Sequence, residues 1–333
     1  MNSIIRPRRL RRTEAIREMV RENHLKASDF IYPLFIHEKD FKEDISAMPG
    51  TYRWDINGLI QEVTRAWVLG VRCVVLFPKI NDSLKTEDGA ECFNEDGLIP
   101  KAIRILKKEI PEMAIMTDVA LDPYSCDGHD GLVDETGKIL NDETIEILKK
   151  QALTQARAGA DFIGPSDMMD GRVGAIRTAL DSEGLSDVGI ISYTAKYSSA
   201  YYGPFRTALD SAPRKNSKKV IPDNKSTYQM DPANSKEALI ESALEQYEGA
   251  DILMVKPGIS YLDIVYRLST FSNKPIAAYN VSGEYSMVKS AAMKNWINEK
   301  DIVLETLLSF KRAGAKLILT YHACDASQWL QDT

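Results

Sequence analysis

The chain has 333 residues, of which 44% are hydrophobic and 27% are charged, and this balance is typical of a soluble globular protein. Its 42 basic and 48 acidic residues leave a net charge of −6, which argues against nucleic acid as a partner. No apolar run approaches the roughly 20 residues needed to span a bilayer, so no membrane partner is expected. The length suits one α/β barrel of about 250 residues with extensions.

The chain begins with the basic sequence MNSIIRPRRLRR, which no apolar segment follows, so this start is not a secretory signal. A transit peptide is a weaker interpretation, because an expected strand already begins at Asp29 and leaves little to cleave. The four cysteines lie far apart and form no CxxC pair, a pattern that suits a reducing compartment. Together these features predict a cytoplasmic protein.

Eight short, nearly continuous apolar runs recur along the chain, as expected for parallel strands that are covered on both faces. Most of them are separated by segments with apolar residues at spacings of three and four, the pattern of amphipathic helices. The expected strands are 29–36, 73–78, 114–119, 161–165, 189–194, 251–255, 275–281 and 316–321. The expected helices are 56–69, 142–158, 173–182, 236–247, 261–269 and 302–313.

Glycine precedes four of these strands, at Gly70, Gly159, Gly249 and Gly314, where it can end a helix in the left-handed conformation. Eight alternating strand and helix units with no evident linker predict a (β/α)8 TIM barrel of the α/β class. A doubly wound open sheet is the alternative. It is disfavoured because no GxGxxG follows the first strand.

We place the barrel domain at residues 29–333. Two segments of the chain are not needed for a minimal barrel: one precedes this domain and one is a long insertion within it. Residues 1–28 are basic but too apolar in places for a free tail, so we interpret them as an arm that docks on another subunit; a solvated helix is the alternative. Residues 203–233 form a long basic loop after the fifth strand. Loops of this length are usually functional lids or disordered, and in a barrel this one would lie over the active-site face.

Two lysines stand at the expected carboxyl ends of neighbouring strands, where a barrel builds its active site. Lys256 directly follows the apolar run 253–255 and is expected to be partly buried, as Lys196 is on the strand before it. Burial lowers the pKa of an ammonium, and a second ammonium nearby lowers it further. A neutral amine can form a Schiff base with a ketone. One such lysine is more often an ion-paired structural residue, but two at equivalent depths favour catalysis.

The segments around these lysines are YTAKYSS at 193–199, YGPFR at 202–206, MVKP at 254–257 and VSGEY at 281–285. They closely resemble the porphobilinogen synthase (5-aminolevulinate dehydratase) family, and the resemblance extends over nearly the whole chain. It implies a lyase that condenses two molecules of 5-aminolevulinate, with loss of water, to the pyrrole porphobilinogen. This reaction belongs to the synthesis of haem and chlorophyll.

The resemblance also implies roles for single residues. Lys256 would form the Schiff base with the first substrate, which becomes the propionate side of the product, and Ser282 and Tyr321 would bind the carboxylate of that substrate. Lys196 would serve the second substrate, either as a Schiff base or as an acid–base group. Both alternatives stay open.

On the long loop, Arg206, Lys225 and Gln229 resemble the residues that bind the carboxylate of the second substrate. Cations on a lid can close over an anionic substrate, which agrees with the basic composition of this loop. For Lys218 and Lys219 we expect only solvated surface charge.

The loop after the third strand departs from the zinc-dependent members of the family, which place three cysteines there. The matching residues here are Ala120, Asp122 and Asp130, and because such zinc sites need soft thiolates we expect no catalytic zinc. Cys126 and His129 lie in the same loop but off the ligand positions, and a substitute zinc site formed by them is the less favoured alternative. Asp122 and Asp130 are instead expected to contact the amino group of the second substrate.

A second metal position is implied by Glu241, which matches the carboxylate that binds an allosteric magnesium in many relatives. Magnesium keeps several waters and needs only one or two carboxylates. Asp170 is a candidate outer-shell partner, supplied by a neighbouring subunit. The resemblance further implies a homo-octamer built from dimers, in which residues 1–28 wrap a neighbour.

Two alternatives belong to other functional classes. A class I aldolase-type lyase shares the barrel and the Schiff-base lysine, but it needs one reactive lysine and usually a phosphate-binding loop. An inactive barrel could act as an interaction module, which the retention of Ser282, Tyr321 and Arg206 argues against. Borohydride trapping with 5-aminolevulinate separates the two classes, because an inactive barrel would not be labelled covalently.

Overall fold

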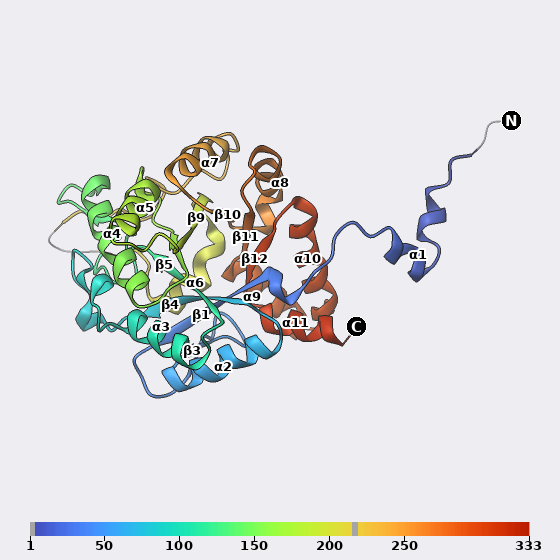
Figure 1. The fold of residues 1–333 in the computed structure, drawn as a ribbon, viewed down its shortest axis with the longest axis horizontal. Coiled ribbons are helices and arrows are strands. Elements are labelled where there is room, and N and C mark those ends of the chain that lie inside the picture. The colour runs from blue at the N-terminus through green and yellow to red at the C-terminus, as the bar shows by residue number, and fades with distance from the viewer. Residues whose placement is uncertain (1–3, 215–218, 333) are drawn as a thin grey trace.

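The computed structural model describes residues 4–214 and 219–332. Within them, eight parallel strands form a closed ring, in which each strand pairs with the next and β12 returns to β1. Figure 1 shows this ring enclosed by helices, which confirms the (β/α)8 barrel against the open sheet. The ring consists of β1 (Phe30–His37), β4 (Cys73–Lys79), β5 (Ala114–Val119), β8 (Phe162–Pro165), β9 (Gly189–Lys196), β10 (Ile252–Lys256), β11 (Ile276–Asn280) and β12 (Leu317–Thr320).

Helices follow the strands and cover the ring from outside. They are α2 (Ile56–Val68), α3 (Leu98–Glu109), α4 (Asn141–Arg157), α5 (Arg172–Ser182), α6 (Gly203–Leu209), α7 (Glu237–Glu248), α8 (Leu262–Phe271), α9 (Ser282–Met293), α10 (Glu299–Ala313) and α11 (Ala323–Gln331), with α1 (Glu14–Met19) ahead of the barrel. The short strands are β2 (Glu43–Asp44), β3 (Tyr52–Trp54), β6 (Leu132–Val133) and β7 (Ile139–Leu140). Short 3-10 helices lie at Pro7–Arg11, Ala27–Asp29, Asp82–Leu84, Ala90–Phe93, Ala200–Tyr202 and Ile259–Tyr261.

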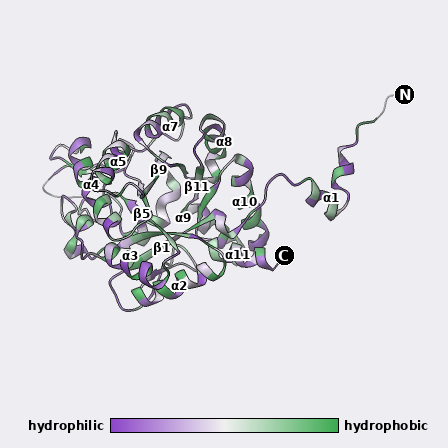
Figure 2. Cartoon of the chain, viewed as in Figure 1, coloured by the Kyte–Doolittle hydropathy of each residue, from purple (hydrophilic) through white to green (hydrophobic). Residues whose placement is uncertain are grey.

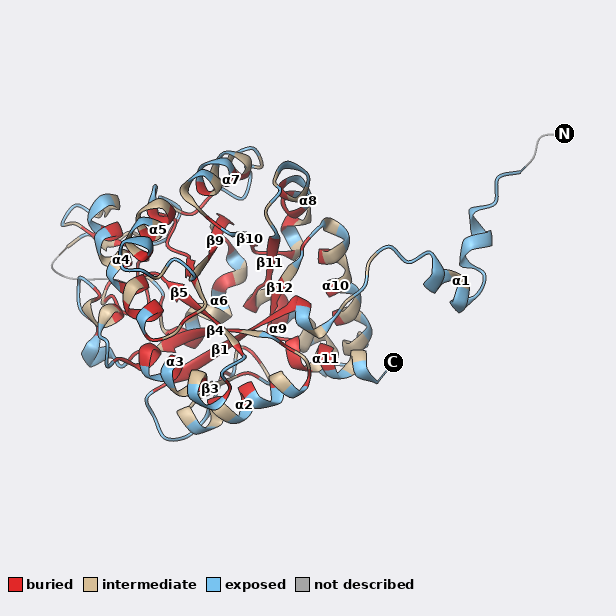
Figure 3. Cartoon of the chain, viewed as in Figure 1, coloured by how far each residue is buried: buried red, intermediate tan, exposed pale blue. Residues whose placement is uncertain are grey.

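The ring strands separate two hydrophobic layers, because successive side chains of a strand point to opposite faces. In β1, Ile31 and Phe35 belong to the layer inside the ring, whereas Tyr32 and Leu34 pack outwards against the helices. Figure 3 shows the strands buried and the helices exposed on their outer sides, and Figure 2 shows hydrophobic residues along the same strands. A polar side chain on the inner face is therefore removed from bulk water.

The helices form where local sequence allows one apolar face to cover the ring, as α2 illustrates. Asp55 caps its start by accepting a hydrogen bond of 3.1 Å from the backbone N–H of Gly58. Leu59 and Val63, four residues apart, lie on its buried face. Gly70 then turns the chain into β4 with a φ of +93°, which favours glycine. The same left-handed geometry occurs at Gly159, Gly249 and Gly314, as predicted.

The structure contains four barrel helices that the apolar spacing did not predict: α3, α6, α9 and α11. α9 begins at Ser282 directly after β11, and α11 follows β12 just as closely, so no loop signal separates strand from helix. α6 lies inside the segment 203–233 that we predicted to be loop. It has only seven residues, but Pro204 in its first turn favours a helix start there.

The segment before the barrel extends away from it, as Figure 1 shows. Its apolar side chains face solvent: Ile5 is 88% and Met19 is 84% exposed. None of the described helices is long and apolar enough to cross a membrane. Exposed apolar residues on an extended arm are consistent with a docking role, which stays a prediction.

Candidate active site

Lys196 ends β9 and Lys256 ends β10, and the two residues are directly paired in the register of these strands. The Tyr193 side chain lies in the layer inside the ring. If side chains alternated strictly along β9, Lys196 would point to the outer face of the barrel. The register shifts between Leu253 and Val255 of β10, so that β9 holds one extra residue. This β-bulge re-aims the end of β9 and lets both lysines reach one site.

The Lys256 ammonium lies within a cage of four aromatic rings. Its Nζ is 5.0 Å from the ring centre of Tyr193, 5.2 Å from Tyr202, 4.9 Å from Phe205 and 4.8 Å from Tyr279. The π faces of such rings attract a cation without supplying a proton acceptor. The cage therefore excludes water while leaving the lone pair of the neutral amine free to react. We did not predict this cage, whose rings come from three separate segments: β9, residues 202–205 and β11.

Burial lowers the pKa of Lys256 to about 7, and the charge of Lys196 lowers it further than burial alone would. Asp118, at the end of β5, opposes this shift; its own pKa is raised to about 6 because the carboxyl is buried. At neutral pH a substantial share of Lys256 is thus a neutral amine. We predicted no role for Asp118, which lies in the expected strand 114–119.

Lys196 lies beside a cluster of carboxylates on the loop after β5. Its Nζ donates a hydrogen bond to the carbonyl oxygen of Ser166 and lies 3.7 Å from Oδ2 of Asp130. Lys225 reaches the same cluster from the segment after α6, with its Nζ 3.0 Å from Asp122 and 3.2 Å from Asp130. The structure thus brings the two predicted aspartates to the second lysine.

Gln229 completes this cluster by donating from Nε2 to Oδ2 of Asp130 at 3.4 Å. Burial favours the neutral acid, but Lys196 and Lys225 outweigh it and hold the pKa of Asp130 well below its usual range. We had assigned the two aspartates to one end of the second substrate and the pair Lys225 and Gln229 to the other end. In this structure the two sets are bonded to each other. The cluster is internally neutralised.

Ser282 and Tyr321 are each bonded to a residue of the aromatic cage around Lys256. The Ser282 hydroxyl accepts a hydrogen bond of 3.0 Å from the backbone N–H of Phe205, and the Tyr321 hydroxyl lies 2.9 Å from that of Tyr279. Both residues are buried at the carboxyl ends of β11 and β12. The structure therefore brings the two predicted hydroxyl groups to the Lys256 side of the site.

Arg206 lies apart from Lys225 and Gln229, with which we had grouped it. Within residues 4–214 and 219–332, no hydrogen bond or ion pair joins its guanidinium to them or to the carboxylates that they bind. Arg206 instead lines a cavity of about 670 Å³ together with Lys79 and Asp210. The three residues predicted to bind the carboxylate of the second substrate are therefore not together in this structure: Arg206 lies in this cavity, and Lys225 and Gln229 lie at the carboxylate cluster.

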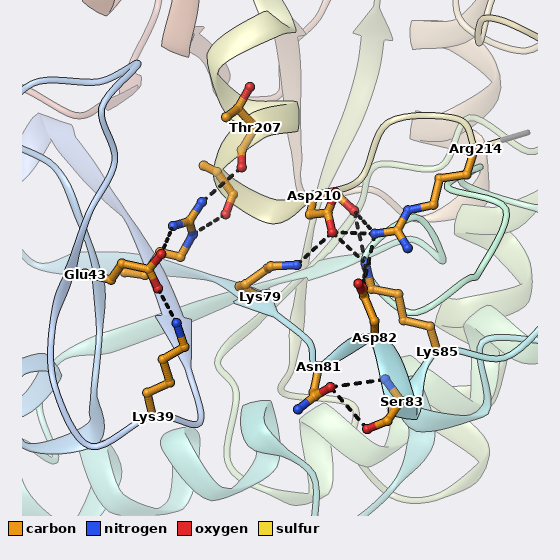
Figure 4. A network of polar contacts seen from close by, with 12 residues as sticks. Lys39, Glu43, Lys79, Asn81, Asp82, Ser83, Lys85, Thr207, Asp210 and Arg214 are labelled. Atoms are coloured by element: carbon orange, nitrogen blue, oxygen red, sulfur yellow. Dashed lines mark hydrogen bonds and ion pairs between the residues drawn. The ribbon is translucent and has the colours of Figure 1, made fainter.

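A network of polar contacts anchors α6, which carries Phe205 and Arg206, to β3 and to the end of β4 (Figure 4). Arg53 donates to the carbonyl oxygens of Thr207 and Ala208, the last turn of α6, at 3.0 and 2.6 Å. Asp210 directly follows the helix. Its carboxylate pairs with Lys79 at 2.9 Å and with Arg214, and its carbonyl oxygen accepts from Lys85 at 3.0 Å.

His129 and Cys126 do not form a joint site on the loop after β5. The ring nitrogens of His129 lie 3.0 Å from the hydroxyl of Tyr228 and 2.9 Å from the carbonyl oxygen of Pro222. The carbonyl can only accept, so the Nε2 that faces it carries the proton, and Nδ1 accepts from Tyr228. Neither nitrogen has a free lone pair for a metal.

One prediction for the basic loop is wrong. Lys219 is not a solvated charge: its side chain is 8% exposed, lies 2.5 Å from Asp127 and donates to the carbonyl oxygen of Val133 at 3.0 Å. The carboxylate of Asp127 is itself buried and requires a cation, a tertiary contact with no local sequence signal. Lys215 and Lys218, also in the predicted lid, lie outside the described residues.

Glu241, on α7, lines a cavity of about 430 Å³ together with Asp170, on the loop before α5. Burial, with the charge of Glu245, raises the pKa of Glu241 to about 7, and Asp170 contributes in the same direction. This carboxylate therefore lacks a full counter-charge. Asp170 was expected from a neighbouring subunit, whereas here it belongs to the same chain, brought close by the fold after β8.

A sequence model of one family, described as delta-aminolevulinic acid dehydratase, matches residues 4–329. The chloroplastic delta-aminolevulinic acid dehydratase of Physcomitrium patens is 57% identical over 327 residues, which cover 98% of this chain and 74% of the relative. The chloroplastic enzyme of Chlamydomonas reinhardtii is 55% identical, over 98% of this chain and 84% of the relative. Similarity of this extent leaves no part of the barrel outside the family.

These relatives overturn the predicted cytoplasmic location. The high-identity relatives, including those of Arabidopsis thaliana and Glycine max, are named chloroplastic, which points to a plastid. Our prediction rested on unpaired cysteines and on the position of the first strand. Free cysteines indicate a reducing compartment but do not specify which one.

A solved structure agrees along the whole chain. The delta-aminolevulinic acid dehydratase (porphobilinogen synthase) of Toxoplasma gondii ME49, in complex with the reaction product porphobilinogen, has a TM-score of 0.96 and 50% sequence identity to this chain. The alignment covers 100% of this chain and 93% of that one. With its paired lysines at the mouth of the barrel, this chain belongs to the delta-aminolevulinic acid dehydratase family.

Proposed function

We propose that Lys256 and Lys196 perform the reaction of the delta-aminolevulinic acid dehydratase family, which this chain catalyses. In that reaction two molecules of 5-aminolevulinate condense, with loss of water, to porphobilinogen. The observation that carries the proposal is the buried, ring-enclosed amine of Lys256 with a pKa near 7. A second lysine at the same depth distinguishes this site from an aldolase-type site, which needs only one.

The first substrate binds at Lys256. The neutral amine attacks the keto carbon, and loss of water leaves a carbon–nitrogen double bond between substrate and Lys256. The aromatic cage stabilises the positive charge of the protonated imine through cation–π attraction. The hydroxyls of Ser282 and Tyr321 hold the carboxylate of this substrate and so orient its keto carbon towards the lysine.

The second substrate binds by replacing an internal ion pair. 5-Aminolevulinate carries an ammonium at one end and a carboxylate at the other, matching the charges of the cluster formed by Asp122, Asp130 and Lys225. The ammonium takes the place of Lys225 beside the two aspartates. Lys225, with Gln229, then turns to the substrate carboxylate, and Arg206 joins it as α6 closes.

Lys196 acts on the second substrate, with two roles open to it. It can form a second Schiff base, or it can transfer a proton between the substrate and Asp130, which lies 3.7 Å away. Borohydride trapping on a Lys256→Met variant distinguishes the roles. A labelled Lys196 supports the Schiff base, and an unlabelled one supports proton transfer.

We propose that the reaction needs no zinc at the loop after β5. Ala120 offers no ligand, and Asp122 and Asp130 are engaged by Lys225, so the residues there suit an ammonium better than a thiophilic metal. We also propose an allosteric magnesium at Glu241, with Asp170 as an outer-shell partner. The metal there would supply the counter-charge that the half-buried Glu241 lacks, and it takes no part in the chemistry.

For assembly we propose a homo-octamer built from dimers. Residues 4–28 carry exposed apolar side chains on an arm that extends from the barrel, as an intersubunit contact requires. Assembly and the order of the α6 segment would then be linked, because an arm that wraps a neighbour can reach that neighbour's barrel mouth.

The test is pyrrole formation from 5-aminolevulinate on protein treated with a zinc-selective chelator, with and without added magnesium. Activity that survives chelation and rises with magnesium supports both metal proposals. Activity restored only by zinc would show that the loop after β5 builds a metal site. Borohydride trapping followed by peptide mapping to Lys256 tests the nucleophile directly, and full activity of Lys256→Ala would overturn that assignment.

A further inference from the structure

We propose that Glu284 is a positioning residue for the first substrate: one buried carboxylate that fixes the chain segments carrying Lys256, Ser282 and Tyr321. The inference rests on the proposed function, since it concerns the geometry of that same site. Glu284 lies in the first turn of α9 and is 3% exposed. It makes no contact with the Lys256 amine and acts through the chain segments that it holds.

The two oxygens of Glu284 bind segments after two different strands. Oε1 accepts a hydrogen bond of 2.8 Å from the backbone N–H of Ile259, three residues beyond Lys256. Oε2 accepts a hydrogen bond of 2.9 Å from the backbone N–H of Val281, the residue before Ser282. The relative position of the amine and the first hydroxyl is therefore set by a single side chain.

A short relay extends this contact to the third strand end. Oε2 of Glu284 also accepts from Nδ2 of Asn280 at 3.2 Å, and Oδ1 of Asn280 accepts from the Thr320 hydroxyl at 3.0 Å. The Thr320 oxygen in turn accepts from the N–H of His322 at 3.2 Å. Tyr321 lies between these two residues, so its backbone is held on both sides.

The burial of Glu284 is difficult to explain by stability. Among residues 4–214 and 219–332 no lysine or arginine forms an ion pair with it, although a buried carboxylate without a counter-ion destabilises a fold. Its hydrogen bonds all come from N–H donors, which a carboxylate can accept simultaneously and a neutral amide cannot. Burial raises the pKa of Glu284 to about 7, although its N–H donors favour the ionised form. A carboxyl group buried at this cost is best explained by the geometry that its hydrogen bonds impose.

The test is a Glu284→Gln variant of the full-length chain, which keeps the side-chain shape but places an NH2 group against an N–H donor. The readout is the concentration of 5-aminolevulinate at half-maximal borohydride trapping on Lys256. We expect this concentration to rise about tenfold or more, the effect of one disrupted hydrogen bond to a charged group. The maximal extent of trapping should change much less.

The matched control is Glu62→Gln, which alters another buried glutamate that accepts hydrogen bonds from Tyr32 and Arg65 on the outside of the barrel. It should lower thermal stability without moving the half-saturation of trapping. An equal shift in both variants, or none in Glu284→Gln, overturns the inference. Wild-type protein that is not trapped at Lys256 overturns the proposed function instead, so the two failures are distinguishable.

If Glu284→Gln does not fold, Thr320→Val decides the question. It removes the hydroxyl that joins Asn280 to His322 and keeps the side-chain shape. A rise of about threefold in half-saturation, roughly half the logarithmic effect of losing a full charged hydrogen bond, supports the relay. An unchanged half-saturation overturns it.

Discussion

Among single residues, Lys256 shows how burial, with a neighbouring positive charge, can keep an amine neutral near pH 7. Lys256 has no acidic ion-pair partner within the described chain, and four rings surround its ammonium, so its charge is removed from water with little compensation. The same loss of hydration that activates the amine also destabilises the folded barrel. The reactivity of this amine and the stability of the folded barrel therefore both increase as the pH rises.

Schiff-base formation should follow the titration of Lys256. Below pH 7 the initial rate of borohydride trapping should rise about tenfold per pH unit, and it should level off above, because only the neutral amine attacks. Replacing Lys196 by Gln removes the neighbouring charge and should move the midpoint to higher pH. A midpoint unchanged in that variant would mean that burial alone sets the shift.

Lys256→Met should abolish pyrrole formation and stabilise the protein. An unfolded lysine keeps its proton up to about pH 10.5, whereas folded Lys256 keeps it only to about pH 7. Lowering the pH through that window therefore favours unfolding of the wild type. The variant should melt on the order of 2–5 °C higher, with a larger difference at pH 6 than at pH 9.5, in thermal scans. A lower melting temperature at pH 6 would contradict the argument.

Among the elements, the strands and most helices could be predicted from the sequence to within a few residues. Their apolar spacing reflects burial on one or both faces, which is a local property. The bulge in β9 could not be predicted: alternation sends Lys196 outwards, and only the pairing with β10 shows the extra residue. The Lys225 contacts with Asp122 and Asp130 join residues about a hundred positions apart, for which one sequence carries no signal.

The contacts of Asp210 should control how firmly α6 covers the site. Asp210→Asn keeps a residue that tolerates the observed φ of +54° but removes the charge that pairs with Lys79 and Arg214. We expect the KM for 5-aminolevulinate to rise about threefold to tenfold, with a smaller change in kcat. Asp181→Asn, which breaks an exposed pair with Arg177 on α5, is the control and should leave KM unchanged.

For the whole molecule, two features connect the single barrel to an assembly: the extended arm and the cavity at Glu241. Both lie away from Lys256, and neither is explained by the fold of one chain. A carboxylate with a pKa near 7 beside a second acidic residue favours a cation, and exposed apolar residues favour a partner surface. Both could be predicted from the sequence only through the family resemblance. From composition alone, Glu241 would be interpreted as part of an exposed helix surface and the arm as a solvated tail.

Glu241→Gln should remove the stimulation of pyrrole formation by magnesium. The amide keeps the shape of the side chain but cannot compensate a divalent charge, so the magnesium titration should become flat. Glu146→Gln, at an exposed position of α4, serves as the control and should keep the wild-type response. Undiminished stimulation in the first variant would place the metal elsewhere.

Removal of residues 1–13 should weaken assembly. The deletion takes away exposed apolar residues Ile4, Ile5 and Leu10 and leaves every element of the barrel in place. Sedimentation velocity should show the truncated chain as a smaller species than the full chain at equal concentration. Equal sedimentation of both would exclude this part of the arm as an assembly contact.

Under the proposed mechanism, the internal neutralisation of the cluster formed by Asp122, Asp130 and Lys225 has a consequence for selective inhibitors. A keto acid that lacks the amino group has no cation to replace Lys225 beside Asp122 and Asp130, so Lys225 should stay paired with them. Such a compound should compete only for the half of the pocket beside Lys256. A compound that blocks the other half must carry a cation, and its affinity should fall when that cation is acylated. The salt bridge thus acts as a chemical filter that distinguishes the two halves of a site built for two identical molecules.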